Sequence, residues 1–184
     1  MIGAITAGLL GTGVAASTTS YESIATVTVG AGGQSTITFS SIPSTYKHLQ
    51  VRGWLTTNTD GGSPIARFNS DSGSNYAAHW LTGNGSSAAA SNSTSTNSMY
   101  FCGTAAGTST TNPMPFVLDI LDYTNTNKNK VIRSLSGRDS NGSGEVGLYS
   151  GVWLNTSAIT TIELQAVSRT INQYSSFALY GIKG

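Results

Sequence analysis

Charge is scarce in this sequence. Of 184 residues, nine are Lys or Arg and eight are Asp or Glu. Charged side chains therefore make up 9% of the chain, against about 25% in an average soluble domain. The surface must be built largely from Ser, Thr, Asn and Gly. With a net charge of +1 and no cluster of Lys or Arg, the chain lacks the electrostatic footprint of a nucleic-acid-binding protein.

Residues that bind metals or carry catalysis are also few. Cys102 is the single cysteine, which excludes an internal disulfide framework, and with two histidines it gives too few ligands for structural zinc. No nucleophile elbow of the Gly-x-Ser-x-Gly type precedes a helix. Asp119 and Asp122 would face opposite sides of a strand, unlike the paired carboxylates of a glycosidase, and Asp119 is better explained by an ion pair with Arg133 or another basic residue. We expect no cofactor and no enzymatic activity.

Hydrophobic residues recur with the two-residue period of β-strands, and no segment has a convincing helical period. The clearest strand runs over 116–121, and a polar turn over 123–130 leads into a second strand over 131–135. We expect these two strands to form a central hairpin. Asn141-Gly142 is a strong turn dipeptide and predicts that the chain reverses again after it.

Further short strands follow the same pattern. Residues 23–29 and 35–39 alternate apolar and hydroxyl side chains around the Gly-rich segment 30–33, which predicts a β-hairpin. Residues 82–98 consist only of Gly, Ala, Ser, Thr and Asn and cannot bury enough apolar area to offset their backbone entropy, so we expect a long exposed loop. The other predicted strands cover residues 47–55, 65–69, 98–102, 114–121, 145–154, 159–167 and 174–182.

About ten short strands without helices predict an all-β fold, an antiparallel β-sandwich or jelly roll with a short apolar N-terminal arm. A chain of this length can form one hydrophobic core without disulfides. We assign residues 1–20 to the arm and residues 21–184 to a single β-sandwich domain.

The first sixteen residues carry no charge and contain four glycines. They are fewer than the roughly 20 apolar residues of a membrane span, and no Lys or Arg precedes Lys47, as a secretory signal would require. We predict an arm that docks on another subunit or on a neighbouring protein; a disordered leader and a signal-like segment ending at Ala16 are the alternatives. The candidate docking residues are Ile2, Ile5, Leu9, Leu10 and Val14.

Three further features have a structural explanation beside a functional one. Residues 139–143 offer oxygens spaced like the start of a calcium loop, but the chelating Glu is missing and a β-turn explains them. His48 and His79 could titrate at an interface or be half-buried. Tyr76 and Trp80 could stack on a sugar ring or pack in the core.

Four segments together resemble one protein family: 20–24 with the strands after it, 42–49, 119–144 and 174–183. On these segments the chain is similar to small virion structural proteins of tailed bacteriophages, including phages of cyanobacteria and other aquatic bacteria. The similarity spans nearly the whole sequence, including its Gly-rich start. No segment is a catalytic signature, and the resemblance supplies no binding residue.

The resemblance implies a non-enzymatic particle component. We expect a capsid decoration (cement) protein on the outer capsid surface of the virion. Its partners would be the major capsid protein and its own copies in a homotrimer, with no nucleic acid and no membrane. The alternative is a tail-fibre or tail-tip component that binds a host surface glycan through Tyr76 and Trp80. A secreted lectin-like accessory domain is a third hypothesis.

Overall fold

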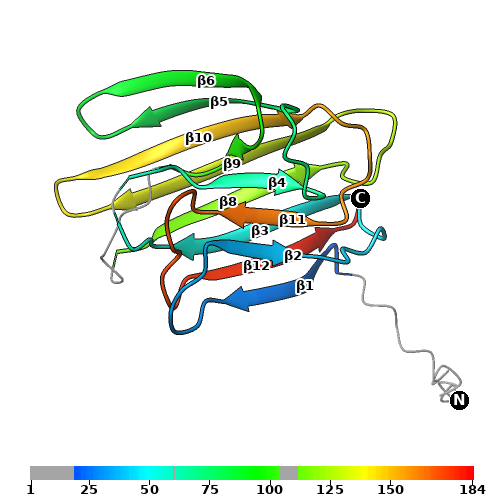
Figure 1. The fold of residues 1–184 in the computed structure, drawn as a ribbon, viewed down its shortest axis with the longest axis horizontal. Helices are drawn as coiled ribbons and strands as arrows, with labels where there is room; N and C mark the ends of the chain where they lie inside the picture. Colours follow the sequence, from blue (N-terminus) through cyan, green and yellow to red (C-terminus); the bar gives the residue numbers. More distant parts are fainter. Residues whose placement is uncertain (1–18, 60, 104–111) are drawn as a thin grey trace, which may run out of the picture.

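The structure is a computed structural model that describes residues 19–59, 61–103 and 112–184. These residues form twelve β-strands and no helix, arranged in two antiparallel sheets (Figure 1). The predicted all-β class and the antiparallel sandwich are therefore confirmed. The strands are β1 (Tyr21–Thr28), β2 (Thr36–Phe39), β3 (His48–Leu55), β4 (Ile65–Phe68), β5 (Tyr76–Gly83), β6 (Ala88–Thr96), β7 (Met99–Tyr100), β8 (Met114–Leu121), β9 (Lys130–Asp139), β10 (Gly144–Trp153), β11 (Ile162–Gln165) and β12 (Ser176–Ile182).

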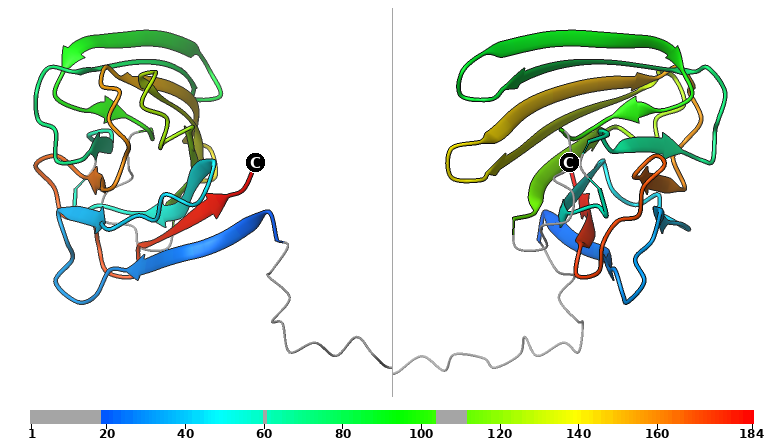
Figure 2. Two further views of the ribbon diagram at one scale, coloured as in Figure 1. Left: turned by 90° about the vertical axis from the view of Figure 1, so that its right-hand side faces the viewer. Right: turned by 60° about the vertical axis from the view of Figure 1, so that its left-hand side comes forward.

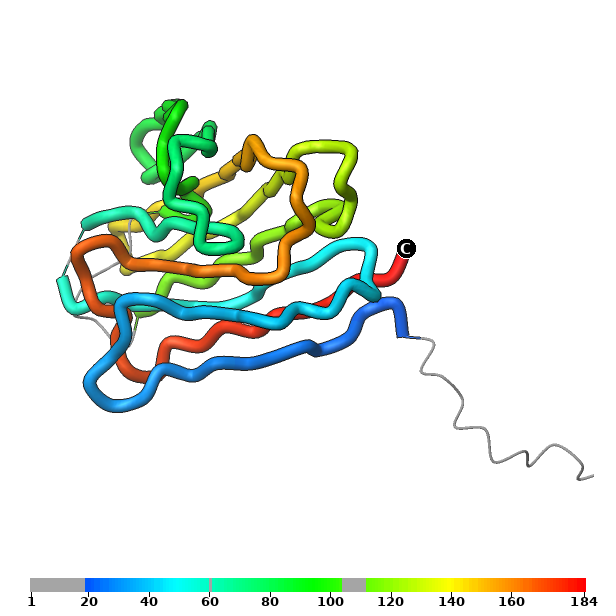
Figure 3. The backbone as a smooth tube through the Cα atoms, turned by 45° about the vertical axis from the view of Figure 1, so that its right-hand side comes forward, coloured from blue at the N-terminus to red at the C-terminus, as the bar shows by residue number. Residues whose placement is uncertain are grey.

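The larger sheet has eight strands in the order β1-β12-β3-β8-β9-β10-β5-β6, and the smaller has four in the order β2-β11-β4-β7. The small sheet lies against one face of the large sheet, which curves so that β1 and β6 lie at opposite ends (Figure 2). The first described residues and the C-terminus lie on one side of the molecule (Figure 3), where the Lys183 amide donates to the Ser20 carbonyl at 3.0 Å.

The core lies between the two sheets. In β8, Phe116, Leu118 and Ile120 are buried, while the alternate side chains point to the outer face. The small sheet contributes buried residues such as Phe68 and Leu164 to the same cluster. Each large apolar side chain removed from water stabilises the fold by roughly 1.5–3 kcal/mol. Burial of this kind carries the stability of a chain with so few charges.

The predicted central hairpin is present. β8 and β9 pair antiparallel with Asp119 opposite Arg133, and Arg133 Nε lies 3.2 Å from Asp119 Oδ2. Asn141 and Gly142 both have positive φ, 51° and 108°, as a type I′ turn requires, and this turn joins β9 to β10. The ion pair and the Asn141-Gly142 turn are thus confirmed. The chain also turns between β8 and β9, but the expectation that residues 123–130 stay out of the core is wrong at both ends, because Tyr123 and Lys130 are fully buried and Lys130 begins β9.

The predicted hairpin of residues 23–29 with 35–39 is wrong. β1 pairs with β12 in the large sheet, whereas β2 pairs with β11 in the small sheet. Gly32 and Gly33, both with positive φ, lie where the chain passes from one sheet to the other. The alternation of apolar residues does not distinguish the two arrangements, because strands that face each other across a core bury the same side chains as strands that pair.

The segment 82–98 is largely exposed, as predicted, but the prediction that it is a loop is wrong. Most of it forms β6, which pairs with β5 so that Ala90 lies opposite Leu81. The side chains of β6 are largely exposed, but β5 offers backbone partners that do not depend on side-chain burial. No strand is predicted from the sequence for the residues of β5.

Leu118→Ala is expected to lower the free energy of unfolding by about 2–5 kcal/mol, because the side chain is fully buried and its loss leaves a cavity. Denaturant unfolding measures this change. Leu154→Ala is the matched control, since Leu154 is exposed and its truncation should change the stability by only about 0.5 kcal/mol. A loss below about 1 kcal/mol at Leu118 would contradict its place in the core.

Candidate functional site

The outer face of the large sheet carries a row of apolar side chains across five neighbouring strands. Val117, Leu135, Leu148, Leu81 and Ala90 lie opposite one another in register on β8, β9, β10, β5 and β6. The three leucines are 50–55% exposed. Large apolar side chains this open, and this close together, mark interaction sites on protein surfaces.

A second row lies beside the first. Trp54 on β3 lies opposite Pro115 on β8. Val146 on β10 lies opposite Gly83 on β5, and Gly83 in turn lies opposite Ala88 on β6. Apolar hollows of about 290 and 300 Å³ lie along these rows, one over β8, β9 and β10 and one over β9, β10, β5 and β6. We name the following nine residues the apolar strip: Trp54, Leu81, Ala88, Ala90, Pro115, Val117, Leu135, Val146 and Leu148.

The strip exists because β9 turns its serines inward. Ser134 and Ser136 are buried, and both hydroxyls are satisfied: Ser134 Oγ donates to the Val117 carbonyl at 2.8 Å, and Ser136 Oγ accepts from the Gly103 amide at 3.0 Å. Leu135, between them in sequence, consequently faces outward. The sequence pattern gives the alternation in β9 but not which of its faces is buried, so the strip was not predicted.

A polar row borders the strip. Gln50, Asp119, Arg133, Ser150 and His79 lie in register across β3, β8, β9, β10 and β5. Gln50 Nε2 donates to Asp119 Oδ1 at 2.6 Å, and the same carboxylate binds Arg133. An apolar centre with a polar margin is the usual anatomy of a protein interface.

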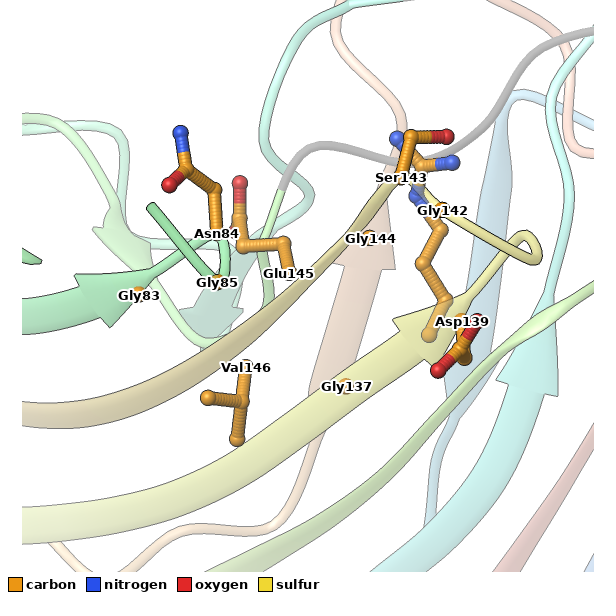
Figure 4. A pocket seen from close by; sticks show the side chains of 11 residues that line it. Gly83, Asn84, Gly85, Gly137, Asp139, Gly142, Ser143, Gly144, Glu145 and Val146 are labelled. Atoms are coloured by element: carbon orange, nitrogen blue, oxygen red, sulfur yellow. The ribbon is translucent and has the colours of Figure 1, made fainter. Parts of the chain in front are cut away.

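A polar groove of about 430 Å³ lies between the turns of the hairpins β5–β6 and β9–β10 (Figure 4). Asn84 and Glu145 lie on one side of it, Asp139 and Ser143 on the other (Figure 4). Arg138 also lines the groove, and its buried Nε has no hydrogen-bond partner in the part of the chain that the structure describes. The groove thus gathers the charged side chains of Arg138, Asp139 and Glu145, groups that can hydrogen-bond a hydroxyl-bearing ligand.

Residues 139–143, for which the sequence left a calcium loop and a β-turn as alternatives, form a turn at one side of the groove. Asp139 Oδ1 accepts from the Asn141 amide at 2.8 Å, and the Ser140 amide donates to the Ser143 carbonyl at 2.6 Å. These are the bonds of an Asx turn at a hairpin. Across residues 19–59, 61–103 and 112–184, no three His, Cys, Asp or Glu side chains lie close enough to hold a metal ion.

The two aromatic residues proposed for glycan stacking are not displayed together. Tyr76 is fully buried, its ring stacks on Trp153 at 6.3 Å, and burial raises the pKa of its phenol to about 12. Trp80 is half-buried with Tyr100 edge-on at 5.2 Å. Tyr76 therefore offers no ring face to a sugar in this structure.

The proposed docking residues of the arm, namely Ile2, Ile5, Leu9, Leu10 and Val14, lie outside the described residues. Within the described ones, no helix has the length and apolar character needed to cross a bilayer.

A cluster of charges fixes the turn after β8, at the end of the strands opposite to the polar groove. Asp122 binds Lys128 and also Lys47, whose Nζ lies 3.1 Å from Asp122 Oδ1. The bonds from the two lysines hold the pKa of Asp122 at about 2. His48 Nδ1 accepts from the Asp122 amide at 2.9 Å, which gives this histidine a structural role.

No family model, no curated protein and no solved structure matches this chain.

Asp122→Asn is expected to destabilise the protein at neutral pH but not at pH 2. Because the folded pKa lies below the ordinary value of 3.8, the ionised carboxylate stabilises the fold above about pH 3.8, and this contribution is lost as the pH falls towards 2. Thermal unfolding of both proteins across this range tests the effect. A difference in midpoint that stays constant down to pH 2 would contradict the lysine contacts.

Proposed function

We propose that this protein is a non-enzymatic structural component of a tailed-phage virion, a decoration protein that docks on the assembled capsid shell. The observation that carries the proposal is the apolar strip. It is an open, polar-bordered apolar surface on a chain with few charges to desolvate on association. The resemblance to virion structural proteins is the reason for proposing a phage particle. The apolar strip supplies a surface by which the protein would bind that particle.

The strand order supports a jelly roll. Without the hairpins β5–β6 and β9–β10, eight strands remain in the orders β1-β12-β3-β8 and β2-β11-β4-β7. Counted along the chain, these are strands 1-8-3-6 and 2-7-4-5, the order of a jelly roll, which is common in viral capsid proteins. Because one fold serves many functions, the strand order supports the proposed function only by analogy, and the apolar strip is the observation on which that function rests.

The proposed mechanism is mass action. A protein that binds the major capsid protein only in the assembled shell stabilises that assembly in proportion to its occupancy. The strip would supply one contact with the outer capsid surface, and the N-terminal arm a second. A homotrimer at a site of local threefold symmetry is the assembly expected for such a protein.

Leu148→Asn is expected to weaken binding to purified capsid shells by at least about tenfold, since a buried leucine contributes roughly 1.5–3 kcal/mol. Co-sedimentation with shells measures the affinity. Leu154→Asn is the matched control, because Leu154 is equally exposed, at 53% against 55%, and lies outside the strip. A variant lacking residues 2–16 measures the contribution of the arm separately. Equal binding by both leucine variants would contradict docking through the strip, and binding only to isolated tails would contradict decoration.

The polar groove favours one second candidate, a tail-fibre or tail-tip component that binds a host glycan. Carboxylates, an arginine and an amide, such as those of Glu145, Arg138 and Asn84, are the groups that hydrogen-bond sugar hydroxyls. This candidate moves the proposed glycan site from the buried Tyr76 to the groove.

Glu145→Gln is expected to weaken glycan-array binding if the groove is the site, because the variant replaces a carboxylate with two acceptor oxygens by an amide with one. Glu163→Gln is the control, since Glu163 lies on β11 outside the groove. Loss of binding in Trp80→Ala alone would instead place the site at Trp80. A wild-type protein that binds no glycan would exclude this second candidate.

A further inference from the structure

The outermost strand of the large sheet, β6, has an open edge. It pairs with β5 on one side, and no described strand pairs with its other side. An open edge exposes a row of backbone amides and carbonyls that can pair with another strand. Along β6 these groups are accessible, because its side chains are small and most are exposed.

The other three edges of the two sheets are shorter or carry charge. β2 has four residues and β7 has two, so these edges offer few backbone amides and carbonyls for pairing with another strand. β1 carries Glu22, which binds Lys183 and accepts from the Tyr46 hydroxyl at 3.0 Å. Short length and edge charges are the usual means by which proteins prevent sheets from joining.

β6 lacks these protections. Its nine residues, AAASNSTST, include no charge and no proline. Its irregularity is confined to one end, where the register with β5 shifts and Ser95 has a φ of 53°. From Ala88 to Ser93 the backbone is regular and can accept a further strand along its length.

The structure also favours a second copy of this chain as the partner. The apolar strip reaches this edge of the sheet, where its last residues are Ala88 and Ala90 of β6. If two copies met at β6 about a twofold axis, their strips would join into one continuous apolar band. The contact would place no charged residue of β6 against its equivalent, and the alanine and serine side chains would permit close approach.

We propose that two copies of the protein pair β6 to β6 in antiparallel orientation, joining two eight-stranded sheets into one continuous sheet. A twofold contact of this kind uses the same surface on both copies and closes on itself. The proposal goes beyond the function proposed above and does not depend on it, because it rests on the open edge of β6 and on the apolar strip that ends there, not on any capsid contact. If the expected threefold contact also exists and its axis meets the twofold axis at a right angle, the two axes together give a hexamer; without the threefold contact the protein is a dimer.

Native mass spectrometry of the full chain at micromolar concentration tests the pairing. An even-numbered assembly, dimer or hexamer, is expected. Asn92→Lys places like charges at the middle of β6 and should weaken the pairing at least about tenfold, giving monomer or trimer. Thr28→Lys is the matched control, because Thr28 is an exposed residue on β1, at the opposite edge of the same sheet.

Cysteine scanning gives a second measurement that does not depend on disrupting the contact. Among single cysteines placed at positions 89–93, the one nearest the axis should form a disulfide-linked dimer under mild oxidation, whereas those further from the axis should not, because their equivalents lie too far apart. The native Cys102 is buried and does not interfere. A wild-type protein that is monomeric or trimeric would overturn the proposal. So would an even-numbered assembly that survives Asn92→Lys and gives no crosslink along β6.

Discussion

The face-to-face packing of the two sheets is the constraint on which the remaining features depend. With only seventeen charged residues in the chain, the fold is stabilised mainly by apolar burial, and that burial is concentrated between β8 and its neighbours on one side and the small sheet on the other. Once the inner faces are filled by residues such as Leu118 and Phe68, the outer face of the large sheet is free of any role in the core. It can therefore carry side chains selected for other purposes.

The distribution of functional surfaces follows the topology. Eight strands form a frame of two facing four-stranded sheets, and the hairpins β5–β6 and β9–β10 pair with each other to extend one of them. Most of the apolar strip, the lining of the polar groove and the open edge of β6 all belong to these two hairpins. The frame supplies stability, whereas the two hairpins supply the surfaces that a partner would contact.

The scarcity of charge gives the few ion pairs distinct local roles. Asp122 with its two lysines fixes the turn that follows β8, and Asp119 with Arg133 holds the polar row beside the strip. Neither cluster lies among the apolar residues of the core. Lys130, by contrast, is buried, and its ammonium donates to three backbone carbonyls, which satisfies it without a carboxylate; burial lowers its pKa.

The sequence by itself determined the all-β class, the central hairpin, the Asn141-Gly142 turn that follows it, and the Asp119–Arg133 pair, because these depend on short-range alternation and on turn chemistry. Only the tertiary structure decided the partners of β1 and β2, the strand character of β6 and the outward position of Leu135. Alternation has a period of two and gives two faces, but which face is buried, and which strand lies alongside, is set by long-range pairing. The apolar strip is a product of that choice, since its residues are adjacent in the sheet and distant in the sequence.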